Sequence, residues 1–103
     1  MDQQLIIKFY RPSLGDEGFL ATLEAELKAA LGDAIVSEGF DVSAKELNLF
    51  LLTADPRQAF RRAKDVIERL GVERGLSAAS RLVGGAKFTP LWPPRATRKF
   101  TLP

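Results

Sequence analysis

The stretch of residues 46–55, Glu-Leu-Asn-Leu-Phe-Leu-Leu-Thr-Ala-Asp, limits most strongly what this chain can fold into. Its length and apolar content are typical of a β-strand, and a strand places alternate side chains on opposite faces. One face would carry Leu47, Leu49 and Leu51, and the other Phe50 and Leu52. An edge strand would alternate more sharply between apolar and polar residues. We therefore expect this strand to lie in the interior of a sheet, with its neighbours arranged around it.

Other stretches of the chain have the alternation of strands or the spacing and end signals of helices. The expected strands are residues 3–10, 34–42, 46–55, 76–83 and 86–92. The first helix follows Pro12, because proline ends the preceding strand, and it ends at Gly32. The second helix begins at Asp55 and Pro56, which suit the cap and the first helical position, and it ends at Gly71.

Glycines predict two local irregularities. Gly39 lies inside the second expected strand, and we expect it to mark a β-bulge that shifts the pairing there. Gly84 and Gly85 lie between the last two expected strands. Both tolerate positive φ, so they predict a two-residue hairpin turn.

The order strand, helix, strand, strand, helix, strand is the pattern of the ferredoxin-like fold. The sequence therefore predicts an α+β protein, a ferredoxin-like βαββαβ sandwich with two helices on one face of a mainly antiparallel sheet and an extra C-terminal edge strand. A chain of 103 residues suffices for one hydrophobic core. We assign residues 1–94 to a single ferredoxin-like domain and residues 95–103 to a basic C-terminal tail.

In this fold the second face of the sheet stays open. It would carry either the leucines of residues 46–55 or Phe50 and Leu52, and either set is more apolar than an open face should be. This pattern favours association with a protein partner or with a second copy, as a homodimer, through the open face or an edge strand. Phe50 and Leu52 are the candidate contact residues on the sheet.

The chain contains no histidine and no cysteine, which excludes several kinds of chemistry. A histidine base, a Ser-His-Asp or Cys-His arrangement, and a histidine or cysteine metal site cannot form. No apolar run reaches the length of about 18 residues that a membrane span needs, and the start of the chain lacks the pattern of a signal peptide. We therefore expect a cytoplasmic protein without catalytic residues, metal, cofactor or membrane contact, and a non-enzymatic role is the preferred interpretation.

Polar residues around the expected central hairpin support an alternative function. Glu38, Asp41 and Glu46 could meet as paired carboxylates, which serve in acid–base chemistry or in binding a hard cation, although solvated surface charges would look the same. Asn48 lies between leucines and must find hydrogen bonds. The alternative is a small-molecule-binding or enzymatic domain with a pocket near Glu38, Glu46 and Asn48.

Charge is unevenly distributed along the chain. Residues 1–55 carry 4 Lys or Arg against 10 Asp or Glu, whereas residues 56–103 carry 11 against 3. An acidic helix beside a basic helix would explain this asymmetry, and so would a basic surface for an anionic partner. Arg61 and Arg62, on the outward side of the second helix, are the candidate contacts of such a surface.

Nucleic-acid binding through the basic second half is a further alternative. RNA-recognition domains of this topology stack bases on aromatic residues of the first and third strands, where Tyr10 and Phe50 are available. The third strand lacks the expected glycine-aromatic pattern and a flanking basic residue. The basic residues fall on the second helix and the tail, so this alternative is disfavoured.

Two segments resemble those of a group of small bacterial proteins of ferredoxin-like type. The first is Glu46-Leu47-Asn48-Leu49-Phe50 with Thr53-Ala54-Asp55-Pro56, and the second is Phe88-Thr89-Pro90-Leu91-Trp92-Pro93. The resemblance implies the same fold and brings no activity with it. It points to Glu46, Asn48 and Trp92 as the first places to look for a ligand-binding site.

Overall fold

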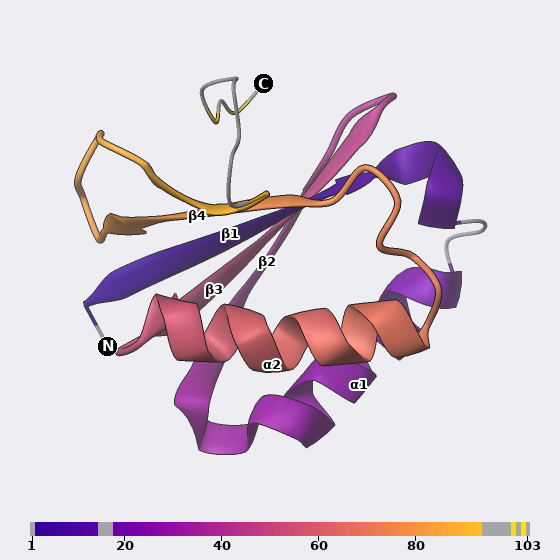
Figure 1. Ribbon diagram of the computed structural model, residues 1–103, viewed down its shortest axis with the longest axis horizontal. Coiled ribbons are helices and arrows are strands. Elements are labelled where there is room, and N and C mark those ends of the chain that lie inside the picture. The colour runs from indigo at the N-terminus through magenta and orange to yellow at the C-terminus, as the bar shows by residue number, and fades with distance from the viewer. Residues whose placement is uncertain (1, 15–17, 94–99, 101, 103) are drawn as a thin grey trace.

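Two helices pack on one side of a five-stranded antiparallel sheet (Figure 1). The computed structural model describes residues 2–14, 18–93, 100 and 102. The elements, in chain order, are β1 (Gln3–Tyr10), η1 (Arg11–Leu14), α1 (Gly18–Leu31), η2 (Gly32–Ala34), β2 (Ile35–Val42), β3 (Glu46–Thr53), α2 (Pro56–Arg69), β4 (Ser77–Leu82) and β5 (Thr89–Trp92). The prediction of an α+β protein is confirmed.

The strands lie in the order β2-β3-β1-β4-β5, and each neighbouring pair is antiparallel. β3 therefore has a strand on either side, which confirms that residues 46–53 form an interior strand. β5 lies at the edge beside β4, where an extra C-terminal strand was predicted. The architecture is compatible with a ferredoxin-like fold, and its five-strand order differs from the ideal four-stranded pattern by this addition.

The start of α2 shows how the sequence sets a helix boundary. The Asp55 carboxylate accepts a hydrogen bond of 3.1 Å from the backbone N–H of Gln58, and Pro56 occupies the first turn. The cap satisfies one of the donors that a helix start leaves unpaired. The predicted start of the second helix is therefore confirmed.

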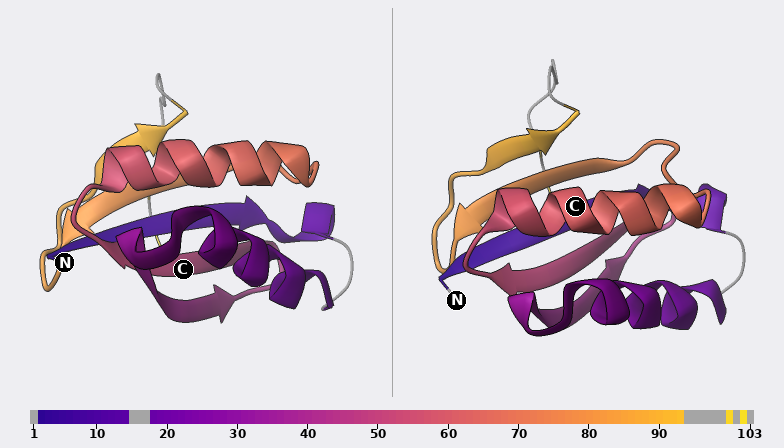
Figure 2. Two further views of the ribbon diagram at one scale, coloured as in Figure 1. Left: turned by 90° about the horizontal axis from the view of Figure 1, so that it is seen from below. Right: turned by 60° about the horizontal axis from the view of Figure 1, so that its bottom comes forward.

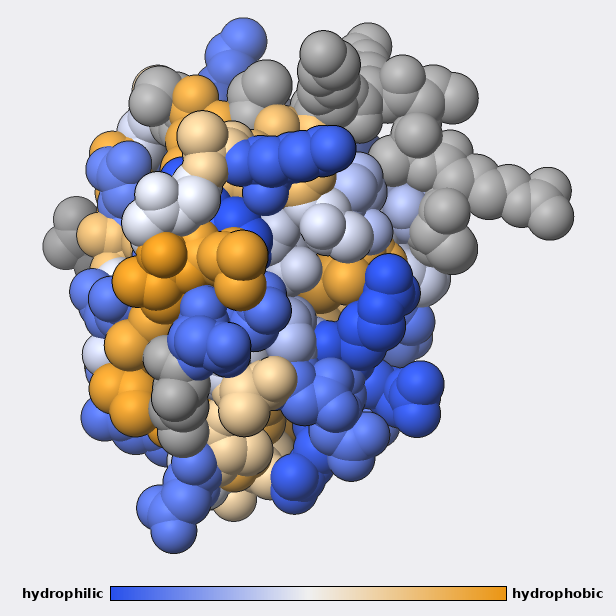
Figure 3. Space-filling view, turned by 90° about the vertical axis from the view of Figure 1, so that its left-hand side faces the viewer, coloured by the Kyte–Doolittle hydropathy of each residue, from blue (hydrophilic) through white to orange (hydrophobic). Residues whose placement is uncertain are grey.

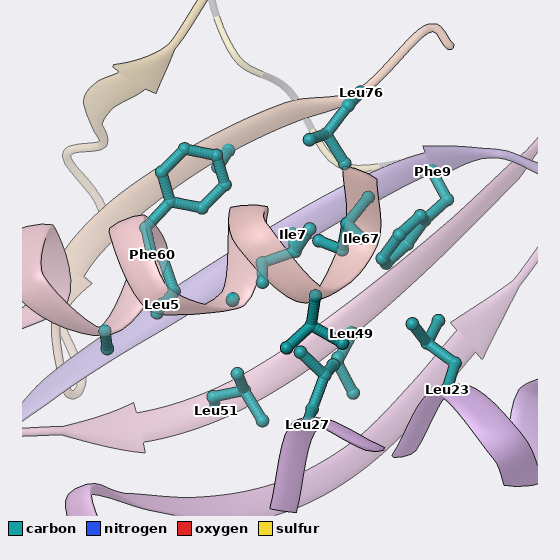
Figure 4. Packing of buried hydrophobic residues seen from close by; sticks show 14 of the residues in the cluster. Leu5, Ile7, Phe9, Leu23, Leu27, Leu49, Leu51, Phe60, Ile67 and Leu76 are labelled. Atoms are coloured by element: carbon teal, nitrogen blue, oxygen red, sulfur yellow. The ribbon is translucent and has the colours of Figure 1, made fainter. Parts of the chain in front are cut away.

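The core lies between the sheet and the two helices, which run side by side over the same face (Figure 2). Alternate residues of β1 and β3 point into it and meet apolar residues of α1 and α2 (Figure 4). The side chains labelled there are Leu5, Ile7, Phe9, Leu23, Leu27, Leu49, Leu51, Phe60, Ile67 and Leu76. Because Leu47, Leu49 and Leu51 face the helices, Phe50 and Leu52 lie on the other face.

The predicted β-bulge at Gly39 is present, whereas the predicted hairpin turn at Gly84 and Gly85 is wrong. Pairing between β2 and β3 shifts between Ser37 and Gly39, where Gly39 has φ of 99°, so the β-bulge is confirmed. The two-residue hairpin turn is not formed, because residues 83–88 separate β4 from β5. The backbone N–H of Gly85 instead donates to the carbonyl of Leu82 at 2.8 Å, which closes a local turn before the loop continues. β5 therefore begins at residue 89 and not at residue 86.

Neither described helix is long and apolar enough to cross a membrane. Of the predicted basic tail, residues 95–103, only Phe100 and Leu102 belong to the described residues, and both are half-buried.

Candidate functional site

The helix-free face of the sheet is the first candidate. Residues paired across neighbouring strands share a face, so this face follows from the register of the strands. It is formed by Gln4, Ile6, Lys8 and Tyr10 of β1, Glu46, Asn48, Phe50 and Leu52 of β3, Ser77, Ala79 and Arg81 of β4, and Val36 and Asp41 of β2. Phe50 and Leu52 are half-buried there.

A row of charged and polar residues crosses the middle of this face at right angles to the strands. Asn48 of β3 pairs with Asp41 of β2 on one side and with Lys8 of β1 on the other. An acid, an amide and a base therefore lie next to one another in three adjacent strands. We call this set the Asp41–Asn48–Lys8 row.

Asn48 is the most unusual member of the row. Its side chain is 0% exposed, and neither its amide nitrogen Nδ2 nor its oxygen Oδ1 has a hydrogen-bond partner among the described residues. A buried donor or acceptor without a partner costs about 1–3 kcal/mol. The amide therefore destabilises the isolated chain, and its presence in the centre of the sheet needs an explanation.

Two of the three carboxylates predicted to meet, Glu46 and Glu38, are each bound to a different neighbour. Glu46 Oε2 lies 3.5 Å from Lys8 Nζ, and Glu38 accepts a hydrogen bond of 2.9 Å from Gln4 Nε2. Gln4 in turn accepts a hydrogen bond of 2.7 Å from Arg81 Nε. Within the described part of the chain, no group of three or more acidic residues could hold a metal ion.

Phe88 and Phe100 contact cationic side chains of the helix-free face. The Phe100 ring lies 4.7 Å from Lys8 Nζ and 5.3 Å from the Phe88 ring, and Arg81 lies 5.0 Å from the Phe88 ring. Two aromatic rings thus lie between the cations of β1 and β4. The face that the sequence predicts to be open is therefore partly covered by the protein's own residues.

A second candidate lies on the opposite side of the sheet, between α2 and β5. A pocket of about 280 Å³ is formed there, which we call the α2–β5 pocket. It is lined by Arg57, Phe60, Arg61, Lys64, Leu91 and Trp92. Lys64 Nζ lies 4.1 Å from the centre of the Trp92 ring, and the Phe60 and Trp92 rings are 6.3 Å apart.

The structure separates some predicted site residues and joins others. Trp92 packs on the helix side, so it does not share a site with Glu46 and Asn48. It shares the α2–β5 pocket with Arg61, although the two residues were selected from the sequence for unrelated reasons. Arg62 instead donates a hydrogen bond of 2.7 Å to the carbonyl of Ala30 and so joins α2 to the end of α1.

Three charged residues of the row and of the pocket were missed from the sequence, namely Arg57, Lys64 and Lys8. Arg57 and Lys64 lie four residues before and three residues after Arg61, so helical spacing alone places all three on one side of α2. Lys8 could not be found in this way, because its position beside Asn48 depends on the pairing of β1 with β3.

Charged and apolar groups are mixed over the rest of the surface. Figure 3 shows one side of the molecule, on which hydrophobic patches are separated by hydrophilic side chains. Arg69 Nη2 lies 3.1 Å from Glu26 Oε2, so one ion pair joins the basic helix to the acidic one. This contact accounts for part of the charge asymmetry, but it leaves Arg57 and Arg61 at the α2–β5 pocket.

Comparison with known proteins found no matching family model, no matching curated protein and no matching solved structure. The geometry of these two sites is therefore the basis for a proposed function.

Proposed function

We propose that this chain is a non-enzymatic protein-interaction module, built on a ferredoxin-like core, that pairs with a second copy of itself through the helix-free face. The Asp41–Asn48–Lys8 row is the observation that carries the proposal.

The row is complementary to itself. A twofold axis that lies in the interface above Asn48 and runs parallel to the strands would place Asp41 of each copy opposite Lys8 of the other. Two pairs of opposite charges would then flank the axis. Charge complementarity of this kind fixes the register of an interface.

The same axis would bring Asn48 against Asn48 of the second copy. Each amide offers N–H donors and a carbonyl acceptor, so two amides related by a twofold axis can hydrogen-bond reciprocally. Both Asn48 atoms that lack partners among the described residues would be satisfied. The pairing would recover the cost of about 1–3 kcal/mol that each buried, unpaired group carries.

Phe100 has to leave Lys8 before a second copy can approach the row. An aromatic pair contributes about 0.5–1.5 kcal/mol beyond the area it buries, and a cation–π contact at an exposed site about 0.5–1 kcal/mol. The contacts of Phe100 with Phe88 and Lys8 are thus weak enough for a partner to replace.

The size of the face limits the affinity. Five strands spaced about 4.8 Å apart and about 20 Å long make a face of roughly 400 Å². A standard interface buries about 800 Å² on each partner. We therefore expect a weak dimer, with Kd on the order of 10–100 µM.

Both outer strands of the sheet are unsuited to pairing with a strand of another chain, which favours association through the helix-free face. The outer strand β2 carries the bulge between Ser37 and Gly39, and the outer strand β5 contains Pro90, which has no N–H to donate. Interruptions of this kind discourage strand addition.

Charge reversal tests the proposal. Asp41→Lys and Lys8→Glu would each place like charges opposite one another when a variant pairs with itself, so each should be monomeric by sedimentation velocity at about 100 µM. When the two variants are mixed, opposite charges meet again at both ends of the row, and a dimer should return.

Asp33→Lys is the matched control for Asp41→Lys. Asp33 is exposed in η2, away from the helix-free face, and its replacement changes the net charge by the same amount. This variant should dimerise like the parent chain, and thermal unfolding should show that all three variants fold. A parent chain that stays monomeric up to about 1 mM, or a mixture that stays monomeric when its components fold, would rule out pairing through the row.

A further inference from the structure

We propose that the α2–β5 pocket binds a small anion with a planar aromatic body, of the aryl carboxylate or aryl phosphate class. The site lies on the other side of the sheet from the helix-free face, so it is independent of the proposed dimer.

The pocket carries more cations than its surroundings neutralise. Arg57 and Arg61 are exposed, and neither forms an ion pair or a hydrogen bond with another described residue. Lys64 Nζ lies 3.1 Å from Glu68 Oε1, so one of the three cations of the pocket is paired with a carboxylate. Two guanidinium groups on one side of a helix suit a carboxylate or a phosphate, because their donors match the paired oxygens of these groups.

The remaining wall is apolar and aromatic. It is formed by Phe60 of α2 and by Leu91 and Trp92 of β5. Aromatic rings prefer offset or tilted partners, as the Phe60 and Trp92 rings show with an angle of 42° between their planes. A planar ring is therefore the ligand group that this wall suits best.

Lys64 joins the two kinds of wall. Its ammonium group lies over the Trp92 ring at 4.1 Å from the ring centre. An anionic group that contacts Lys64 Nζ would leave the rest of the same small molecule beside Trp92 and Leu91. A single ligand that carries both an anionic group and an aromatic ring would therefore contact both walls of the pocket.

The volume restricts the size of this ligand. The pocket measures about 280 Å³, whereas sites for drug-sized ligands usually measure about 300–1,000 Å³. One aromatic ring with one anionic group fits this volume better than a larger ligand does.

Fluorescence of Trp92, the only tryptophan in the chain, gives a direct reading of the site. Phenyl phosphate and benzoate should each produce a saturable change, with Kd of about 1 mM or tighter for at least one of them. Comparing the two shows whether phosphate or carboxylate is preferred. Inorganic phosphate, which lacks the ring, should bind at least about tenfold more weakly than phenyl phosphate.

Two arginine variants make the test specific. Arg61→Gln should raise Kd about tenfold, whereas Arg74→Gln, which removes the same charge from an exposed turn after α2, should leave Kd within about twofold of the parent value. Backbone amide shifts in nuclear magnetic resonance spectra should locate binding at α2 and β5 without relying on tryptophan.

Three results would overturn the proposal. These are no saturable change up to about 10 mM for either aryl ligand, equal losses of affinity in the two arginine variants, and equal affinity for inorganic phosphate and phenyl phosphate.

Discussion

Asn48 is buried in the centre of the sheet, and its side-chain amide has no hydrogen-bond partner among the described residues. Its neighbours in β3, Leu47 and Leu49, are buried against the helices, and its own amide is buried on the other face without partners among the described residues. A leucine at this position would satisfy the isolated fold better, because it has a similar shape and no polar atom. The amide is thus a cost to the single chain that the proposed pairing would remove.

Replacing Asn48 separates the stability of the chain from its association. Asn48→Leu should raise the free energy of unfolding of the monomer by about 1–3 kcal/mol, because it removes two unpaired buried groups. The same change should weaken the dimer at least about tenfold, because the amide pair is lost. Urea unfolding at low protein concentration measures the first effect, and sedimentation velocity measures the second.

Leu52→Asn provides a comparison on the same face and the same strand, at a half-buried position. It should not stabilise the monomer. If Asn48→Leu lowers the free energy of unfolding by more than about 1 kcal/mol, the Asn48 amide makes hydrogen bonds in the folded chain and is not an unpaired buried group.

At the scale of elements, α2 is defined by a few residues at its start. Asp55 caps the helix, and the apolar residues that follow are buried in the core, including Ala59, Phe60 and Ala63. The cap contributes independently of this packing, because it satisfies a backbone donor at the first turn.

Asp55→Ala should therefore lower the free energy of unfolding by about 0.5–2 kcal/mol. Urea unfolding of the full chain measures this change. Asp65→Ala, at an exposed position in the same helix, is the matched control, and it should change stability by no more than about 0.5 kcal/mol. Equal effects of the two substitutions would show that the loss of a negative charge, and not the loss of the cap, is responsible.

The elements were predictable where one local signal decided them. Asp55-Pro56 predicted the start of α2, and Gly39 predicted the bulge in β2. The hairpin turn predicted from Gly84-Gly85 was wrong, because two glycines allow a tight hairpin but do not require one. The course of residues 83–88 depends on how β5 pairs with β4, and that pairing is a contact between distant residues that turn chemistry does not specify.

At the scale of the molecule, the same difficulty explains which site residues were predictable. Trp92 was selected from the resemblance of its segment, Arg61 from the basic second helix, and Asn48 as a polar residue between leucines. Their grouping depended on which face of the sheet each strand presents, and the register of β5 placed Trp92 beside α2. A one-residue shift of register would have sent it to the other face.

Phe100 connects the C-terminal residues with the proposed association. Phe100→Ser removes the ring that lies against Lys8 and Phe88, so it should strengthen the dimer by about tenfold, since the ring no longer has to be displaced. Sedimentation velocity over a range of concentrations measures this change. Val83→Ser, at a position that is 58% exposed in the loop after β4, is the control and should leave the dimer unchanged.

A weaker dimer of Phe100→Ser would have a different meaning. The Phe100 ring would then be a contact within the interface, and it would complete the helix-free face instead of covering it.

The interruptions in the outer strands β2 and β5 also limit how far the sheet could be extended by further chains. Because the bulge in β2 and the proline in β5 each break the row of backbone donors along their edge, chains added side by side could not continue the sheet indefinitely. Contact through a face with twofold symmetry, by contrast, uses up the surface that makes it, and no free copy of that surface is left for a third chain. If the chain pairs through the helix-free face as proposed, assembly would therefore stop at two copies and would not extend into a fibre.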